Sequence, residues 1–382
     1  MPENREIEDF LALCLREGNQ KWPGGWASAE SRRALCDRVD AHGIVLFLVK
    51  GKGEFSNWPE PVRTALRDQA RRQAFWEESH RLQLVRLLDA LVKRRVPTLL
   101  MKGTAFAYSV YPDPALRRRG DSDLLVTQDR LDEARSAFRE LGFGLAEQTV
   151  GVVFQETWRL RSPDGLTHDF DLHWRVSDAP ILQKVLREDD LFEGSVPLPR
   201  LAENAQMTNP VHGFVQCCIN QSWHEFSGYQ RGPLESHWGM RLIWMLDIGL
   251  QARAFSGKDW DELQAFAIRT GTAELILRLL ERMREVLEID APDSVRQALA
   301  AEGGNSEILH YIMTFDHSVR FKANWRAAGN WRLRLAYLRG IAFSTPGHLR
   351  SKYPDHDRWP IFALQIRRIA GNVCKLVTGS AK

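Results

Sequence analysis

Residues 96–176 alternate short apolar runs with helical patterns, and this segment constrains the fold more than any other part of the chain. The predicted elements are, in order, a strand at 97–101, a helix at 104–111, a strand at 122–126, a helix at 128–141, and strands near 151–161 and 166–176. A Ser-Pro-Asp-Gly turn signal at 162–165 joins the last two strands. The order predicts a small α/β unit with a mixed sheet.

The chain on either side of this unit shows apolar residues at helical spacing. In the long stretch 61–92 the predicted core stripe consists of Phe75, Leu82, Val85, Leu88 and Leu91. A chain of 382 residues is long enough for two or three domains. We therefore expect an α+β protein with an N-terminal helical region at 1–94, a core at 95–178 and a C-terminal helical domain at 179–382.

Two carboxylates stand at the entrance of the predicted strand 122–126. Asp121 and Asp123 are two residues apart, and side chains at this spacing point to the same face of a strand. Such a pair suits Mg²⁺, a hard cation that prefers oxygen ligands. A capping pair in a Pro- and Arg-rich loop is the alternative for Asp121 and Asp123 taken alone.

A glycine turn precedes this pair in the sequence. The apolar run at 96–101 ends in Lys102, Gly103 and Thr104, and a helical pattern follows. Glycine lets the backbone approach a ligand closely, and exposed N–H groups at a helix start favour phosphate. Lys102 is either a surface lysine or a contact to a triphosphate.

A third carboxylate follows on a later predicted strand. The alternation there places Asp169, Asp171 and His173 on one face. A third carboxylate completes a second metal site or accepts a proton in phosphoryl or nucleotidyl transfer. We prefer Asp171, because Asp169 lies nearer the turn and is expected to be solvated. His173 is either structural or orients Asp171.

These residues in this order resemble the nucleotidyltransferase superfamily related to DNA polymerase beta. The fuller pattern is similar to the bacterial uncharacterised nucleotidyltransferase family, nucleotidyltransferase family 5, over roughly residues 60–355. The motifs that carry the resemblance are Leu100-Met101-Lys102-Gly103, Tyr111-Pro112-Asp113-Pro114-Ala115-Leu116-Arg117, Gly120-Asp121-Ser122-Asp123-Leu124-Leu125-Val126, Leu141-Gly142-Phe143, Asp171-Leu172-His173-Trp174-Arg175, Trp223-His224, Arg241-Leu242-Ile243-Trp244-Met245-Leu246-Asp247 and Tyr337-Leu338-Arg339.

The resemblance implies a role for each matching position. Gly103 and Thr104 fall on the superfamily's phosphate-contacting turn. The implied metal ligands and catalytic residues are Asp121, Asp123 and Asp171. Lys102, Arg117 and His173 match the family's own pattern.

Arginine forks grip phosphate oxygens well. The cluster at 117–119 immediately precedes the metal pair, and within it we assign nucleotide binding to Arg117, with a solvated loop as the alternative. His224 and Asp247 lie on predicted helices as accessory candidates, where they either form a buried pair or line the acceptor pocket.

Composition narrows the class of protein. The net charge of +3 argues only mildly against nucleic acid as a partner. A basic, aromatic segment at 320–339 has the spacing of an amphipathic helix with a charged outer face.

Five cysteines without a Cys-x-x-Cys pair argue for reduced thiols in the cytoplasm and against a zinc site. The start of the chain does not resemble a signal peptide, and no apolar run approaches the ~20 residues that span a bilayer.

The sequence as a whole predicts an enzyme. We expect a Mg²⁺-dependent (or Mn²⁺-dependent) nucleotidyltransferase that binds an NTP such as ATP, moves its NMP group to an unknown acceptor and releases pyrophosphate. The acceptor is a small molecule, a peptide or a protein. The alternative is a non-catalytic member of the same fold that senses nucleotide or binds a partner.

Overall fold

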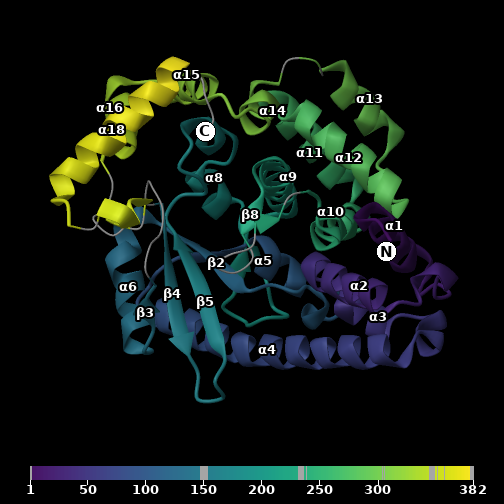
Figure 1. Ribbon diagram of the computed structural model, residues 1–382. Helices are drawn as coiled ribbons and strands as arrows, with labels where there is room; N and C mark the ends of the chain where they lie inside the picture. Colours follow the sequence, from purple (N-terminus) through teal and green to yellow (C-terminus); the bar gives the residue numbers. More distant parts are fainter. Residues whose placement is uncertain are drawn as a thin grey trace.

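The computed structural model describes residues 2–146, 154–230, 236–237, 239–302, 304, 306–343, 349–350, 352–356 and 358–378. It is an α+β protein in which helices surround one mixed, seven-stranded sheet (Figure 1). The sheet runs in the order β3-β4-β5-β2-β1-β7-β6. This confirms the predicted fold class.

The N-terminal helices precede the sheet. They are α1 (Asn4–Glu17), α2 (Ala29–His42), α3 (Val45–Lys50) and α4 (Glu60–Lys93). In Figure 1 the long α4 runs beneath the sheet and beneath α2 and α3, so one helix supports both. Pro61 in its first turn suits a helix start, where the missing N–H has no helical partner to lose.

Most strands and helices of the central unit lie close to their predicted positions, but the short strand β3 was not predicted. They are β1 (Thr98–Met101), α5 (Lys102–Ser109), β2 (Asp121–Val126), α6 (Leu131–Glu140), β3 (Gly144–Leu145), β4 (Gln155–Arg161) and β5 (Thr167–His173). Residues 151–153 of the strand expected at 151–161 lie outside the described residues. β1 pairs antiparallel with β2, and β2 pairs parallel with β5.

Helices dominate the rest of the chain. The elements are α7 (Pro180–Val185), α8 (Glu188–Glu193), β6 (Val196–Pro197), β7 (Gln206–Met207), α9 (Pro210–Ser227), β8 (Tyr229–Gln230), β9 (Ser236–His237), α10 (Leu242–Ala254), α11 (Gly257–Thr270), α12 (Ala273–Leu287), α13 (Asp293–Ala301), α14 (Glu307–Ile312), α15 (His317–Ala327), α16 (Trp331–Ala342) and α18 (Ile361–Thr378). The sheet continues into this part, because β7 pairs parallel with β1 and β6 pairs with β7. The sequence did not predict these two short strands.

The core stripe predicted for α4 is wrong in part. Phe75 and Leu82 are 58% and 50% exposed. The face that α4 buries near the sheet carries polar residues instead, among them Glu77 and His80. These residues belong to a hydrogen-bonded network that is described with the site.

Two features of the described residues bear on the chain's chemistry. None of the helices there is long and apolar enough to cross a membrane. Cys14, Cys36, Cys217 and Cys218 are free thiols. The side chain of Cys374 lies outside those that the structure describes.

Candidate active site

Parallel pairing of β2 with β5 brings the predicted carboxylates together. Asp123 lies directly opposite Asp171 in the register, and Asp121 lies opposite Asp169. The apolar residues of β2, Leu124, Leu125 and Val126, are fully buried and anchor the strand in the core. The acidic end of β2 is therefore held at the edge of the core, facing a cavity.

That cavity has a volume of about 570 Å³. Its lining includes Asp121, Asp123 and Asp171 together with the turn residues Lys102 and Gly103. Asp169 is not in this lining, and its carboxylate pairs with Arg159 through two hydrogen bonds of 2.7 Å. Asp171 therefore lines the cavity and Asp169 does not, although Asp169 is half-buried in an ion pair rather than solvated.

Asp123 is the most heavily contacted of the three carboxylates. Its Oδ1 accepts a 2.6 Å hydrogen bond from Lys102 Nζ and lies 2.9 Å from His173 Nε2. Burial opposes ionisation of Asp123, yet the charge of Lys102 and the contact with His173 hold the pKa of Asp123 well below its usual value. Asp123 is therefore charged at neutral pH.

Asp121 has the opposite electrostatic environment. Its side chain is accessible from the cavity. Partial removal from water, followed by repulsion from Asp123 and Asp171, raises the pKa of Asp121 to about 7. Repulsion of this kind between neighbouring carboxylates is relieved by a bound cation.

Asp171 is fixed by the neighbouring strand β4. Thr157 donates a 2.6 Å hydrogen bond to Asp171 Oδ1, and Gln155 Nε2 donates to Oδ2 at 3.1 Å. Burial, reinforced by the charge of Asp123, raises the pKa of Asp171. Sequence reasoning missed Thr157 and Gln155, because the turn at 162–165 does not by itself fix the register that sets Thr157 opposite Asp171.

The donor atoms suit a hard divalent cation. One ligand atom each from Asp123, Asp171 and His173 lie within 4.8 Å of one another. Asp121 is two residues from Asp123 on the same face of β2. Several carboxylate oxygens with one imidazole nitrogen form a donor set that Mg²⁺ or Mn²⁺ accepts.

The turn before α5 has an unusual backbone. Lys102 adopts a positive φ of 51°, which is uncommon for a residue with a side chain. This conformation joins the end of β1 to the start of α5 while the Lys102 ammonium reaches Asp123. The hydroxyl of buried Thr104 donates to Ser122 Oγ at 2.9 Å. The backbone N–H groups of the turn are therefore the donors that remain for a phosphate.

Arg117 is buried and paired. Its Nε and Nη2 each donate a 2.7 Å hydrogen bond to Asp247 of α10. Tyr111 donates to the same carboxylate at 2.8 Å. A Cβ on Gly103 would lie 3.0 Å from the Arg117 guanidinium, so the glycine makes room for this side chain. Arg117 therefore lines the cavity with its charge balanced by Asp247, which is not part of the lining.

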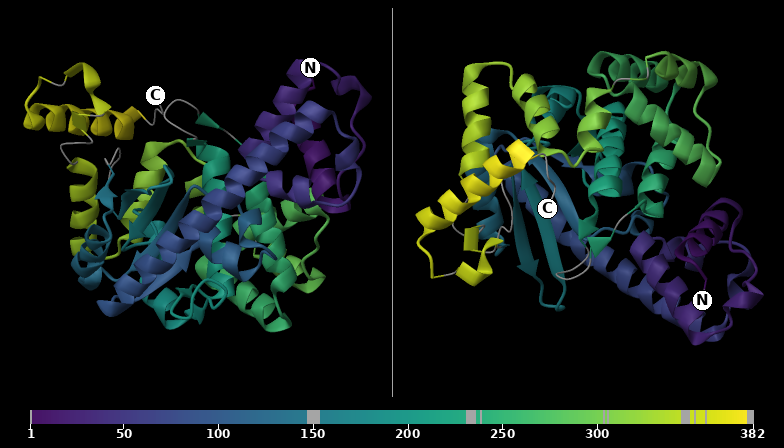
Figure 2. Two further views of the ribbon diagram at one scale, coloured as in Figure 1. Left: turned by 90° about the horizontal axis from the view of Figure 1, so that it is seen from below. Right: turned by 45° about the horizontal axis from the view of Figure 1, so that its top comes forward.

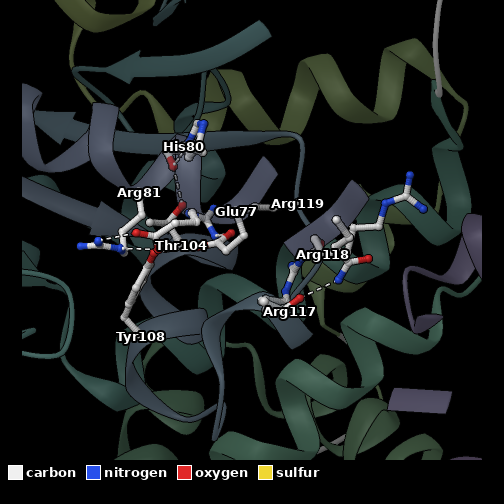
Figure 3. A network of polar contacts seen from close by, with 12 residues as sticks. Glu77, His80, Arg81, Thr104, Tyr108, Arg117, Arg118 and Arg119 are labelled. Carbon is white, nitrogen blue, oxygen red and sulfur yellow. Dashed lines mark hydrogen bonds and ion pairs between the residues drawn. The ribbon is translucent and has the colours of Figure 1, made fainter. Parts of the chain in front are cut away.

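A second polar network supports β2 from below. Tyr108 and Arg119 both donate to the carboxylate of Glu77 on α4. Figure 3 shows Glu77, Arg119 and Tyr108 close together, with Arg117 and Arg118 apart from them. His80 Nε2 lies 2.8 Å from Ser122 Oγ, between the two aspartates of β2.

A smaller, more apolar cavity of about 290 Å³ adjoins the first. Residues common to both linings are Lys102, Gln155, Asn220 and His224. His224 on α9 stacks on Trp244 of α10, with 5.4 Å between ring centroids. The structure thus places His224 where the two cavities meet, while Asp247 lies buried beneath Arg117.

Comparison with known proteins identifies a family for this chain. The model of the uncharacterised nucleotidyltransferase family matches residues 28–288, more than half of the chain. The chain belongs to this family. No curated protein and no solved structure matches it.

As a member of this nucleotidyltransferase family, the chain is classed as a transferase. The match includes every candidate site residue, from Lys102 to Asp247. It begins earlier than the resemblance expected from residue 60 and ends before the motif at 337–339. The helices after residue 288 therefore lie outside the part shared with the family.

Proposed function

We propose that this nucleotidyltransferase moves an NMP group from an NTP to a small acceptor in a reaction that depends on Mg²⁺ or Mn²⁺. The observation that carries the proposal is the parallel register of β2 and β5, which sets Asp123 beside Asp171 and leaves Asp121 on the same cavity wall. A divalent cation held there would supply charge that balances the triphosphate and polarises the phosphorus that is attacked.

Each residue has a defined part in the proposed reaction. Asp121 and Asp123 would hold the cation, and Asp171 would complete the site or accept the proton of the acceptor. The bond from the acceptor oxygen to the α-phosphorus forms as the α–β phosphoanhydride bond breaks, and pyrophosphate leaves. Lys102 and the backbone at Gly103 face the cavity where the phosphates would lie.

The adjoining cavity of about 290 Å³ suits the acceptor. Its walls include the apolar residues Leu182, Ile219 and Trp223. His173 Nδ1 and Gln216 Oε1 are buried in this lining with no hydrogen-bond partner among the described residues. Because buried polar atoms are nearly always paired, both atoms are available to an acceptor that carries polar groups on an apolar body.

The test uses the full chain, each labelled NTP, Mg²⁺ or Mn²⁺, and cell extract. We expect a labelled product with at least one NTP. Asp171→Asn should retain Mg-NTP binding and lose transfer on the order of 10²-fold or more if Asp171 acts as a general base. Asp169→Asn is the matched control, because it changes the same residue type on the same strand outside the cavity.

Two outcomes would contradict the proposal. A wild-type chain that binds NTP and labels nothing in any extract would be a nucleotide sensor. A transfer defect in Asp169→Asn with none in Asp171→Asn would move the third carboxylate to the other position of the alternation.

A further inference from the structure

The last helices expose an unusual amount of apolar surface. We call the described residues among 331–378 the C-terminal arm; it contains α16 and α18. No described residue of α16 is buried. Trp331, Leu335 and Leu338 are 68%, 57% and 38% exposed, and their i, i+4, i+7 spacing places them on one face. A helix normally buries such a face.

The exposed apolar surface continues beyond α16. Phe362 and Ile366 lie one turn apart on α18 and are both more than 60% exposed. Phe343 and Trp359 between the two helices are exposed as well. Both views of Figure 2 show the arm at the periphery of the molecule, away from the N-terminal helices. The sequence predicted a charged outer face for an amphipathic helix within 320–339. The outer side of α16, which lies partly in that segment, carries apolar side chains as well.

The same part of the chain is strongly basic. Residues 331–382 contain ten Lys and Arg and only two acidic residues, a net charge of +8. The whole chain carries +3, so the other 330 residues are net negative. Arg332 and Arg339, seven residues apart on α16, are exposed beside its apolar face. On α16, apolar and basic side chains are therefore exposed next to each other.

Three kinds of occupant can be distinguished by chemistry. A second copy of the chain would bring one strongly basic arm against another, and like charges oppose that contact. Nucleic acid would pair with the arginines and stack on Trp331, but it offers nothing to Leu335 or Ile366. An anionic bilayer surface accepts the arginines at its phosphates and the Trp, Phe and Leu side chains at the boundary with the acyl chains.

We propose that the C-terminal arm docks the protein on the surface of an anionic lipid bilayer. The arm lies in the plane of the interface, with Trp331, Leu335 and Phe362 inserted and Arg332 and Arg339 at the headgroups. It lies outside the residues that match the family, so the proposal does not depend on the proposed reaction.

The test measures cosedimentation of the full chain with vesicles. One set contains phosphatidylcholine alone, and the other contains phosphatidylcholine mixed with phosphatidylglycerol. Binding should require phosphatidylglycerol and should weaken as salt is raised. Leu335→Ser combined with Phe362→Ser should weaken it about tenfold or more, and Arg332→Glu with Arg339→Glu should do the same.

The matched control removes exposed apolar side chains elsewhere. Phe75→Ser with Leu82→Ser on α4 changes residues that are 58% and 50% exposed outside the arm. This variant should bind vesicles as the wild type does. Circular dichroism should show that every variant keeps its helices.

Several results would overturn the proposal. Equal binding of the wild type to both vesicle sets would contradict docking on an anionic surface. If the α4 control lost as much vesicle binding as the arm variants do, the arm would have no specific part in binding. A dimer that Leu335→Ser with Phe362→Ser converts to a monomer, without vesicle binding by the wild type, would make the arm an interface between copies. Tight binding of a single-stranded RNA without vesicle binding would make it a nucleic-acid surface.

Discussion

Arg117 shows how strongly burial sets the role of a single charged side chain. It is 7% exposed, and its partner Asp247 is 1% exposed. Burial would lower the pKa of Arg117, but the charge of Asp247 raises it, so the guanidinium stays protonated. Removing one member of such a pair leaves an uncompensated charge in the core.

We expect Asp247→Asn to lower the free energy of unfolding by about 3–5 kcal/mol. Urea denaturation measures the loss. The double variant Arg117→Met with Asp247→Leu should lose less than the sum of its single variants, because no lone charge remains. Additive losses would show that the two side chains do not depend on each other.

Gly103 is constrained by the same arginine. We expect Gly103→Ala to lower stability by about 1–3 kcal/mol, because the added Cβ forces the guanidinium to move. It should also weaken Mg-NTP binding, which calorimetry measures. Gly120→Ala is the control: Gly120 lines the same cavity, and a Cβ there meets nothing within 4 Å. Equal effects of the two substitutions would rule out the steric explanation.

Sequence spacing predicted which carboxylates share a face, because alternation along a strand is a local property. The structure accordingly places Asp121, Asp123 and Asp171 at one cavity. The pairing of Arg117 was not predictable in this way. Its partner Asp247 lies 130 residues further along the chain, and no local pattern connects the two.

At the scale of elements, α4 shows where helical periodicity fails. Apolar spacing selected a face that includes Phe75 and Leu82, whereas the helix buries Glu77 and His80 against the sheet. Those polar side chains are buried because Arg119, Tyr108 and Ser122 satisfy them. Hydrophobicity alone cannot reveal a buried face that is held by hydrogen bonds.

The buried face of α4 predicts how stability depends on pH. Burial, followed by the charges of Arg119 and His168, holds the pKa of His80 well below its ordinary value. Below about pH 6.5 the unfolded chain binds a proton at His80 that the native protein does not, so stability falls as pH falls, by up to ~1.4 kcal/mol per unit. Asp121 has the opposite effect on stability. Because its pKa is raised in the native protein, the native protein binds a proton there more readily than the unfolded chain, which favours the native state as pH falls.

Comparing variants isolates the contribution of His80. Urea denaturation of wild type and His80→Gln at pH 7 and pH 5 should show a shallower fall in the variant. Buried His42, whose pKa is lowered to about 3 by burial and by nearby arginines, should keep part of the acid sensitivity in both proteins. Identical slopes would exclude His80 as a source.

Strand prediction succeeded where the apolar run was long enough. β1, β2 and β5 contain four or more residues each with buried members. β6 and β7 contain two residues each, too few to show any periodicity. β7 joins the sheet by pairing with β1, and β6 joins it by pairing with β7; the pairing with β1 is a tertiary contact.

At the scale of the whole molecule, ligand binding should be visible in thermal stability. A ligand that binds only the folded state at a hundredfold excess over Kd stabilises by about 2.7 kcal/mol. Mg-NTP should therefore raise the melting temperature in differential scanning fluorimetry, and EDTA should remove most of the gain. Lys102→Ala should shrink it. No shift with any NTP under any metal condition would contradict nucleotide binding.

The contact between Arg117 and Asp247 also affects the order in which parts of the fold form during synthesis. During synthesis, β1, α5 and β2 leave the ribosome well before α10 does, because α10 begins at residue 242. Until α10 has been made, Arg117 lacks its counter-ion Asp247. The turn at Gly103 then packs against an arginine that is not yet fixed in place. Contacts this distant in sequence close late in folding. A nascent chain therefore completes the cavity that Arg117 lines only after its helical half has been made.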